Sequence, residues 1–242
     1  MKTVIIVQAR MTSTRLPGKV LMRVMDKPLL QYQIERLRKV SLADDIVIAT
    51  TINRTDDPVV DLCDRLNVKS FRGLEDDVLL RYYDTAVREK ADVIIRSTAD
   101  CPLIDPRVID QIIACYKNNP AQYDFVSNTI RRTYPRGLDA ELFSFEVLEK
   151  IHRLSTEAEQ REHVTPYVYD HFNEFKYFNV ACAEGDYSHH RWTVDQREDL
   201  ELVTLIIKEL YPQTPYFCMQ DVIDLLDKNP EWLKINAGVK QK

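Results

Sequence analysis

The sequence predicts an α/β fold whose sheet is mostly parallel and carries helices on both faces. Runs of β-branched residues recur at 3–7, 45–51 and 92–98, and the segments between these runs have helical periodicity. Such alternation is typical of parallel sheets, whose strands are buried on both faces. No linker rich in Gly, Pro or Ser divides the 242 residues, so we expect one domain over 1–242.

The first half supplies strands and helices in turn. The run at 3–7 is interpreted as a strand, because Gln8 and Arg10 interrupt it too early for a signal peptide. Helices predicted at 29–40, 59–66 and 78–90 alternate with the strands at 45–51 and 92–98. Asp57 and Asp105 each precede a proline, which predicts that both residues cap helices.

The second half has a different character. It predicts a helix at 157–171, short strands near 175–181 and 190–194, and further helices at 200–210 and 219–228. We interpret the segment around 129–190 as a small insertion on the same sheet that covers the substrate or contributes to dimerisation.

Composition and charge argue against several classes of protein. The formal net charge is −5 and the chain has no run of Lys and Arg, which argues against general nucleic-acid binding. No apolar run approaches the roughly 20 residues of a membrane helix, so we expect a cytoplasmic protein without membrane segments. The five cysteines are scattered and never spaced as CxxC, which favours reduced thiols over a zinc site or disulfides.

A basic loop follows the first predicted strand. It contains Arg10, Arg15 and Lys19, and ligands of open parallel sheets sit beyond the carboxyl ends of the strands. These cations could contact several phosphate oxygens, and Gly18 would let backbone amides approach closely. A solvated loop with surface ion pairs is the alternative. The five glycines form neither GxGxxG nor a Walker loop, so any nucleotide is held differently.

The string QARMTSTRLPGKVL at 8–21, followed by KPLLQYQIERL at 27–37, resembles the opening of cytidylyltransferases that activate acidic sugars. That superfamily includes CMP-KDO synthetase and CMP-acylneuraminate synthetases, and the resemblance is closest to its spore coat polysaccharide biosynthesis proteins. It extends, with gaps, over nearly the whole chain and implies a Rossmann-like sheet of the nucleotide-diphospho-sugar transferase type. In the family pattern ARxxSxRLPGK the loop wraps phosphates, which implies this role for Arg10, Ser13, Arg15 and Lys19.

Two aspartates are candidate ligands of Mg²⁺. The resemblance matches Asp100, just past the strand at 92–98, to the family's metal-binding aspartate, and Asp195 to the first aspartate of a late VDxxEDLE segment. From the residues alone, Asp100 could cap a turn, and Asp195 with Glu198 resembles a helix-capping pair. Capping and ligation are compatible, because a carboxylate has several lone pairs.

The resemblance also suggests where the base of the nucleotide binds. The resemblance of the segment 70–86 implies that Arg72 approaches the base. Arg81 is ranked below Arg72, because it could simply pair with Asp77 on its helix. Backbone groups at the end of the first strand and hydroxyls after the strand at 92–98 could approach a pyrimidine. The candidate nucleotide-binding residues are therefore Gln8, Ala9, Arg10, Ser13, Arg15, Lys19, Arg72, Ser97 and Thr98.

The acceptor pocket is expected in two segments shared with the spore coat relatives, 134–141 and 160–169. Ordinary helix surface and core packing are the alternatives for each residue. This chain carries STADCP where acidic-sugar synthetases often carry QGDxP, so its contacts to base or sugar differ there. The candidate acceptor-binding residues are Arg136, Asp139, Glu141, Arg161 and His163.

These patterns predict a Mg²⁺-dependent nucleotidyltransferase that condenses CTP with an acidic sugar of the nonulosonic-acid type. Arg15, Lys19, Asp100 and Asp195 would be catalytic, because positioned cations stabilise the charge that builds up on phosphates. A glycosyltransferase is the alternative, although the chain has no Asp-x-Asp metal motif. A non-catalytic protein that senses nucleotides or acts as a scaffold is the third hypothesis. By analogy with relatives, we expect a homodimer.

Overall fold

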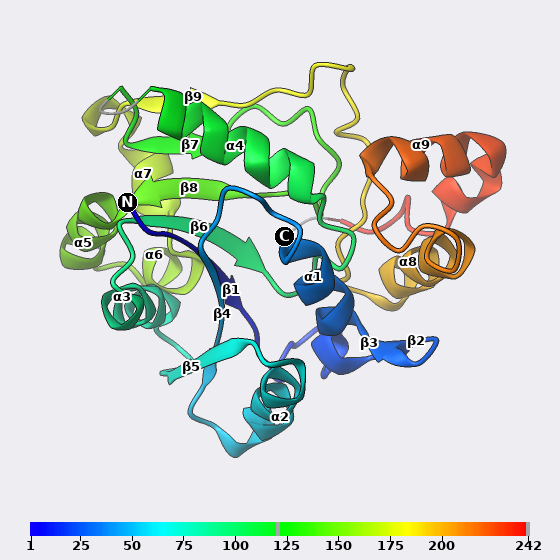
Figure 1. Ribbon diagram of the computed structural model, residues 1–242, viewed down its shortest axis with the longest axis horizontal. Helices are drawn as coiled ribbons and strands as arrows, with labels where there is room; N and C mark the ends of the chain where they lie inside the picture. The colour runs from blue at the N-terminus through cyan, green and yellow to red at the C-terminus, as the bar shows by residue number, and fades with distance from the viewer. Residues whose placement is uncertain (120–121, 241–242) are drawn as a thin grey trace.

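The computed structural model describes residues 1–119 and 122–240, which fold around a seven-stranded sheet (Figure 1). The order across the sheet is β5, β4, β1, β6, β8, β7, β9, and among these strands only β8 runs antiparallel to its neighbours. The prediction of a mostly parallel α/β sheet is confirmed. The strands are β1 (Thr3–Gln8), β4 (Asp45–Thr51), β5 (Lys69–Gly73), β6 (Val93–Thr98), β7 (Phe125–Ser127), β8 (Glu141–Ser144) and β9 (Tyr177–Asn179); β2 (Arg23–Val24) and β3 (Lys27–Pro28) form a separate hairpin.

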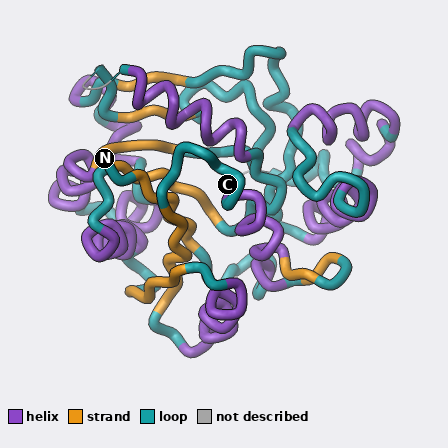
Figure 2. Tube along the Cα trace, in the orientation of Figure 1, coloured by secondary structure: helices purple, strands orange, loops and turns teal. Residues whose placement is uncertain are grey.

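Helices cover both faces of the sheet, as Figure 2 shows. They are α1 (Leu29–Leu37), α2 (Asp57–Leu66), α3 (Val78–Glu89), α4 (Pro106–Asn118), α5 (Phe145–Leu154), α6 (Ala158–His163), α7 (Pro166–Asp170), α8 (Arg197–Leu210) and α9 (Met219–Lys228). Ile5 and Val7 of β1 pack in a core with α1, α2, α4, α8 and α9. Val4 and Ile6 pack on the opposite side with α3, α5 and α7. Since successive strand residues point to opposite faces, one apolar strand serves both cores.

The prediction of one helix over 157–171 is wrong. Two short helices, α6 and α7, occupy this region, and Val164 between them has a positive φ of 73°. Pro166 begins α7. A proline lacks the N–H that would continue a helix and its ring clashes with the preceding turn, so the chain breaks here.

The segment 129–190 contributes β8 and β9 to the main sheet together with the helices α5, α6 and α7. β8 lies between β6 and β7, so this segment is part of the framework of the sheet. The strand expected near 175–181 is present as β9. Residues 190–194 form no strand and make a single bridge, between Arg136 and Arg191.

One of the two predicted helix caps is present. Asp105 accepts a hydrogen bond from the N–H of Arg107 at 2.9 Å at the start of α4. Asp57 instead is the first residue of α2, which begins without a side-chain cap, so that prediction is wrong. The preceding residue, Asp56, is buried and accepts a hydrogen bond from the N–H of Met11 at 2.8 Å. It therefore ties the basic loop to the sheet.

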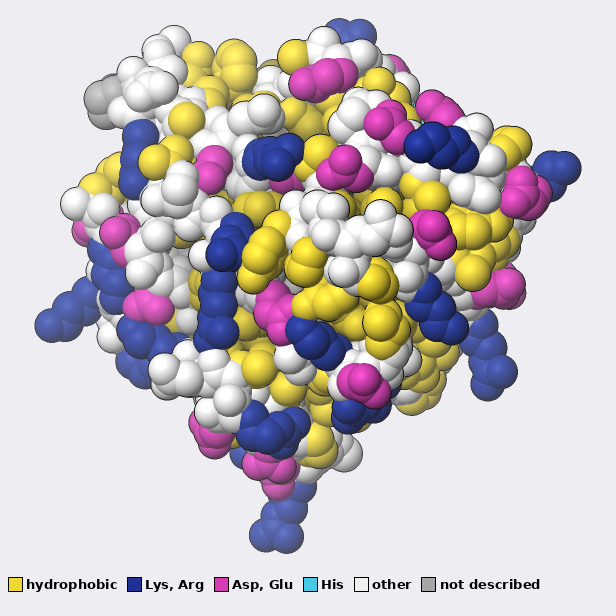
Figure 3. Space-filling view, turned by 45° about the vertical axis from the view of Figure 1, so that its right-hand side comes forward, with side chains coloured by type: hydrophobic (Ala, Val, Ile, Leu, Met, Phe, Trp, Pro, Cys, Tyr) yellow, Lys and Arg dark blue, Asp and Glu magenta, His cyan; other side chains and the backbone are white. Residues whose placement is uncertain are grey.

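The surface mixes charges of both signs. On the face drawn in Figure 3, Lys and Arg side chains are interspersed with Asp, Glu and apolar side chains. Within the described ranges, no helix combines the length and the apolar composition that crossing a bilayer requires.

Candidate active site

A cavity of about 750 Å³ draws its lining from both halves of the chain. It opens where β1 and β6 end, which is where an open parallel sheet is expected to bind ligands. Its lining residues are Gln8, Ala9, Arg10, Ser13, Thr14, Arg15, Lys19, Val20, Val78, Arg81, Arg96, Thr98, Ala99, Asp100, Cys101, Arg136, Asp139, Glu159, Glu162, His163, Pro166, Thr193 and Asp195.

The basic loop forms one wall of this cavity. Gly18 has a left-handed φ of 73°, a conformation that residues with a Cβ rarely adopt, and its N–H donates to the carbonyl of Met11 at 2.8 Å. This bond closes the loop, and a 3₁₀ turn (Lys19–Leu21) follows at once. The side chain of Lys19 is therefore held inside the cavity wall, where it is largely buried.

The two aspartates and the basic loop converge. Nζ of Lys19 lies 2.9 Å from Oδ2 of Asp100 and 2.8 Å from Oδ1 of Asp195. Nη2 of Arg15 forms an ion pair with the same Oδ1 of Asp195, at 2.7 Å. The cations and carboxylates that the sequence assigned to one site therefore share one site in space.

Backbone contacts hold the two aspartate segments side by side. The N–H of Val194 donates to the carbonyl of Asp100 at 2.8 Å, and the hydroxyl of Thr193 donates to the same carbonyl at 3.2 Å. Gly137 packs against this segment with φ of 105°, so close that a Cβ there would lie 2.8 Å from the nitrogen of Thr193. Only glycine fits this approach.

Asp195 does not cap the following helix. The capping box of α8 consists of Gln196 and Asp199, so the expected pairing of Asp195 with Glu198 is wrong. Because the cap of α8 lies one residue later than expected, the carboxylate of Asp195 takes no part in the capping box. One of its oxygens faces Lys19 and Arg15, while the other accepts from Nη2 of Arg191 at 2.7 Å.

The opposite charges of Lys19 and Asp100 stabilise one another's ionised forms. Burial by itself would lower the pKa of Lys19, but the carboxylates of Asp100 and Asp195 outweigh burial and raise it. Burial would raise the pKa of Asp100, but Lys19 and the hydroxyl of Thr98 lower it. Burial raises the pKa of the Cys101 thiol well above its usual value, and the nearby Asp100 adds to this. Cys101 thus lines the cavity as a neutral thiol and is a poor nucleophile.

The residues present fit a divalent metal. Asp100 and Asp195 lie close enough to share one cation, since both contact Nζ of Lys19. Among the described residues, no group of three or more His, Cys, Asp and Glu side chains is placed to hold a metal. Magnesium commonly takes one or two protein carboxylates and fills its remaining positions with phosphate oxygens and water. The two carboxylates, which lie beside the basic loop, match this preference.

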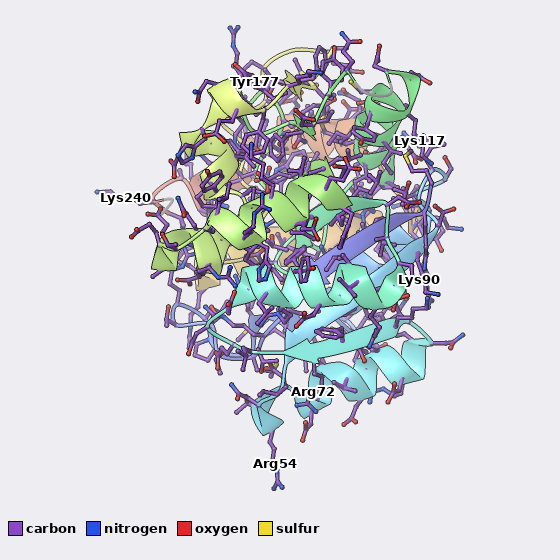
Figure 4. All side chains as sticks on the ribbon, turned by 90° about the vertical axis from the view of Figure 1, so that its left-hand side faces the viewer. Arg54, Arg72, Lys90, Lys117, Tyr177 and Lys240 are labelled. Atoms are coloured by element: carbon purple, nitrogen blue, oxygen red, sulfur yellow. The ribbon has the colours of Figure 1, made fainter. Side chains whose placement is uncertain are left out.

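Most of the candidate nucleotide-binding residues line the cavity, but Arg72 and Ser97 do not. Arg72 lies on β5 at the edge of the sheet, as Figure 4 shows, and donates to the carbonyl of Thr51 at 2.8 Å and to Asp57 at 2.7 Å. Ser97 is buried and accepts from Gln33 on the far side of β6. Arg81 lines the cavity instead, so the ranking of Arg72 above Arg81 does not match their placement.

Among the candidate acceptor-binding residues, Arg136, Asp139 and His163 line the cavity, and Glu141 and Arg161 do not. Glu141 is buried on β8, where it accepts from Arg96 at 2.6 Å. Arg161 pairs with Asp77 across α3 and α6 and donates to the carbonyl of His152 at 2.9 Å. Their donors and acceptors are thus engaged within the fold.

Sequence reasoning missed Arg96, which lines the cavity from β6. Strand periodicity could have found it, because Arg96 and Thr98 lie two positions apart and share one face of the strand. Sequence reasoning also missed polar residues that packing brings to the wall: Thr14, Glu159, Glu162 and Thr193.

The chain matches the family model for cytidylyltransferases over residues 4–214. It belongs to the cytidylyltransferase family. The suspected family is thereby confirmed. A cytidylyltransferase structure from Leptospira borgpetersenii serovar Hardjo-bovis is 35% identical, with a TM-score of 0.92 over 96% of this chain and 97% of that chain.

Further similarities extend over most of this cytidylyltransferase. An uncharacterized protein of Methanocaldococcus jannaschii is 40% identical over 100% of this chain and 97% of that protein. The spore coat polysaccharide biosynthesis protein SpsF of Bacillus subtilis is 34% identical over 93% of this chain and 94% of SpsF. A CMP-2-keto-3-deoxy-manno-octonic acid synthetase in complex with CTP has the same fold, at 21% identity and a TM-score of 0.66 over 87% of this chain and 100% of that chain.

Proposed function

We propose that this cytidylyltransferase condenses CTP with an acidic sugar of the nonulosonic-acid type, giving a CMP-sugar for a surface polysaccharide and pyrophosphate. Mg²⁺ is the proposed cofactor. The convergence of Lys19 and Arg15 with Asp100 and Asp195 in the wall of one cavity carries this proposal. The names of the relatives, which include a synthetase with bound CTP and a polysaccharide biosynthesis protein, support it.

In the proposed reaction an acceptor hydroxyl oxygen bonds to the α-phosphorus of CTP. The bond from that phosphorus to the bridging oxygen breaks, pyrophosphate leaves with the electron pair, and the hydroxyl proton is released. Negative charge builds up on the phosphoryl oxygens, so fixed cations stabilise the transition state. When bound, Mg²⁺ supplies part of this positive charge.

Within the described part of the chain, one unpartnered donor and one unpartnered acceptor in the cavity wall suit CTP as the ligand. The buried Nη1 of Arg15 has no hydrogen-bond partner among the described residues, as expected of a donor that awaits a phosphate oxygen. The buried Oε1 of Gln8, at the end of β1, is likewise without a partner there. In the proposal it accepts from the exocyclic amino group of cytosine, which uracil lacks.

The acceptor side of the cavity is proposed to include Arg136, Asp139 and His163. Arg136 and Asp139 both line the cavity, and Asp139 also pairs with Arg132. A guanidinium suits a carboxylate, and a carboxylate suits sugar hydroxyls. The proposed homodimer and the cytoplasmic location rest on analogy with relatives and on the composition.

Pyrophosphate release tests the proposal directly. Purified protein is incubated with CTP, UTP, ATP or GTP, Mg²⁺ and each member of a panel of acidic sugars. We expect release that depends on both CTP and an acidic sugar, with formation of the CMP-sugar. No release with any combination would contradict the transferase, and transfer from a preformed nucleotide sugar would instead support a glycosyltransferase.

A further inference from the structure

The two carboxylate oxygens of Asp195 have different surroundings. Oδ1 faces the cavity, where Lys19 and Arg15 lie 2.8 and 2.7 Å away. Oδ2 accepts from Nη2 of Arg191 at 2.7 Å, on the side away from the basic loop. Asp195 and Arg191 are both buried, so this second contact is shielded from water. One oxygen thus faces the cations of the cavity, and the other is bound by Arg191.

Arg191 is itself fixed by a second aspartate. Its Nε donates to Oδ1 of Asp199 at 2.9 Å, and its Nη2 lies 3.3 Å from Oδ2 of Asp199. Asp199 is fully buried and also accepts from the N–H of Asp195 at 3.0 Å. Asp199 therefore orients the guanidinium and, at the same time, the backbone that carries Asp195.

The C-terminal segment completes this arrangement. Nδ2 of Asn236 donates to the carbonyl of Arg191 at 2.9 Å and to Oδ1 of Asp199 at 3.0 Å. Asn236 is buried, and it lies beyond residue 214, where the match to the family model ends. Figure 1 shows that the chain turns back after α9 toward the sheet.

A carboxylate that ligates a metal needs a fixed orientation, and neighbouring hydrogen-bond donors commonly provide it. The planar fork of an arginine presents its donors in fixed directions to two carboxylates, and the compact ammonium of a lysine does not reproduce that geometry. Arg191 makes such a double contact, with Asp195 and Asp199. Loss of the fork would leave Oδ2 of Asp195 buried without a donor and free the carboxylate to rotate.

We propose that Arg191 is a positioning residue, held by Asp199 and Asn236, that presents Oδ1 of Asp195 to the metal–nucleotide complex. This inference rests on the proposed function, because it takes Asp195 as a metal ligand. Asn236 extends the positioning network into the C-terminal segment. The residues act through Asp195 and do not touch the reacting atoms.

Calorimetric titration of CTP at graded Mg²⁺ concentrations tests the inference without any turnover. The readout is the Mg²⁺ concentration that half-maximally enhances CTP binding. Arg191→Gln is expected to raise it about 10- to 100-fold, the usual effect of removing a partner of a metal ligand. Arg191→Lys keeps the charge but lacks the fork, so it is expected to resemble Arg191→Gln. A purely structural role would lower the melting temperature and leave the Mg²⁺ requirement unchanged.

A milder pair of variants covers the case in which Arg191→Gln fails to fold. Asn236→Ala keeps Arg191 and is expected to raise the half-maximal Mg²⁺ concentration about three- to tenfold. Asn229→Ala is the matched control, because Asn229 lies in the same segment and its side chain, among the described residues, donates to the carbonyl of Leu225 alone, at 2.8 Å. It is expected to leave the Mg²⁺ requirement unchanged.

The outcomes separate the two levels of the inference. If Mg²⁺ does not enhance CTP binding to the wild type, the metal part of the proposed function fails, and the positioning role fails with it. If Mg²⁺ enhances binding equally in the wild type and in Arg191→Gln, only the positioning role is overturned. Equal Mg²⁺ requirements of Asn236→Ala and Asn229→Ala would remove Asn236 from the network.

Discussion

Nζ of Lys19 lies 2.8 Å from Oδ1 of Asp195, although 176 positions of the chain separate the two residues. The contact joins the loop after the first strand to the segment before α8. It forms because β1 and β6 are neighbours and because the backbone of Val194 bonds to Asp100 at the end of β6. Both ends of the contact thus depend on the centre of the sheet.

Lys19→Met is expected to lower kcat for pyrophosphate release by about 10²-fold or more, since it removes one positioned cation from the transition state. It also leaves Asp100 and Asp195 without their shared ammonium. Mg²⁺ should therefore raise the melting temperature of the variant more than that of the wild type. Lys27→Met is the control, because Lys27 pairs with Glu35 outside the cavity. Equal kcat values in the two variants would contradict the role of Lys19.

Asp100→Asn and Asp195→Asn are each expected to weaken the dependence of activity on Mg²⁺ and to lower kcat, because an amide is a poorer ligand than a carboxylate. The measurement is the initial rate of pyrophosphate release against Mg²⁺ concentration. Asp57→Asn, at the partly exposed ion pair with Arg72 outside the cavity, serves as the control. Ordinary turnover in both active-site variants would refute the metal assignment.

The stability of the protein should depend on Asp100 in acid. The pKa of Asp100 in the folded state lies below its ordinary value of 3.8, because Lys19 and Thr98 outweigh burial. Its ionised form therefore stabilises the fold above that pH, and this contribution is lost as the pH falls through the lowered pKa. Urea unfolding between about pH 2.5 and 5 should show a steeper acid loss in the wild type than in Asp100→Asn. If the free energies of unfolding of the wild type and of Asp100→Asn fall equally with pH, the prediction is wrong.

Gly137→Ala should destabilise the fold and impair the site together. The residue has a φ of 105°, and an added Cβ would lie 2.8 Å from the backbone of Trp192 and Thr193. We expect a loss of about 1 to 3 kcal/mol in the free energy of unfolding, together with a lower kcat, because the displaced segment carries Asp195. Gly238→Ala is the matched control, since nothing lies within 4 Å of its Cβ position. Similar unfolding midpoints for the two variants would show that the close approach is not required.

Gln8→Leu should weaken the preference for CTP over UTP, because it removes the unpartnered amide at the end of β1. The expected change is about tenfold in the ratio of kcat/KM for the two nucleotides, as for the loss of one hydrogen bond. Arg72→Gln is the control. Its hydrogen bonds lie outside the cavity, so it should lower stability by about 1 kcal/mol without changing nucleotide preference. A change in nucleotide preference with Arg72→Gln alone would reverse the two assignments.

Local signals in the sequence predicted much of the fold. The apolar runs at 3–7, 45–51 and 92–98 became β1, β4 and β6, because a strand buried on both faces must be apolar throughout. Asp105 before Pro106 marked the start of α4 correctly. Pro166 signals the break between α6 and α7. The helical periodicity continues across this proline, and it therefore predicts a single helix.

By itself, the sequence determined the alternation of the central strands with helices in the first half, the basic loop and the family, since these depend on residues adjacent in the chain. Only the tertiary structure decided that Arg81 lines the cavity and Arg72 does not. It also decided that Gln196 and Asp199, rather than Asp195 and Glu198, form the capping box of α8. It alone revealed that Arg191 contacts Asp195 and that Asn236 in turn donates to the carbonyl of Arg191. The reason is physical: which polar side chain reaches a cavity depends on packing between distant segments, which local propensity does not encode.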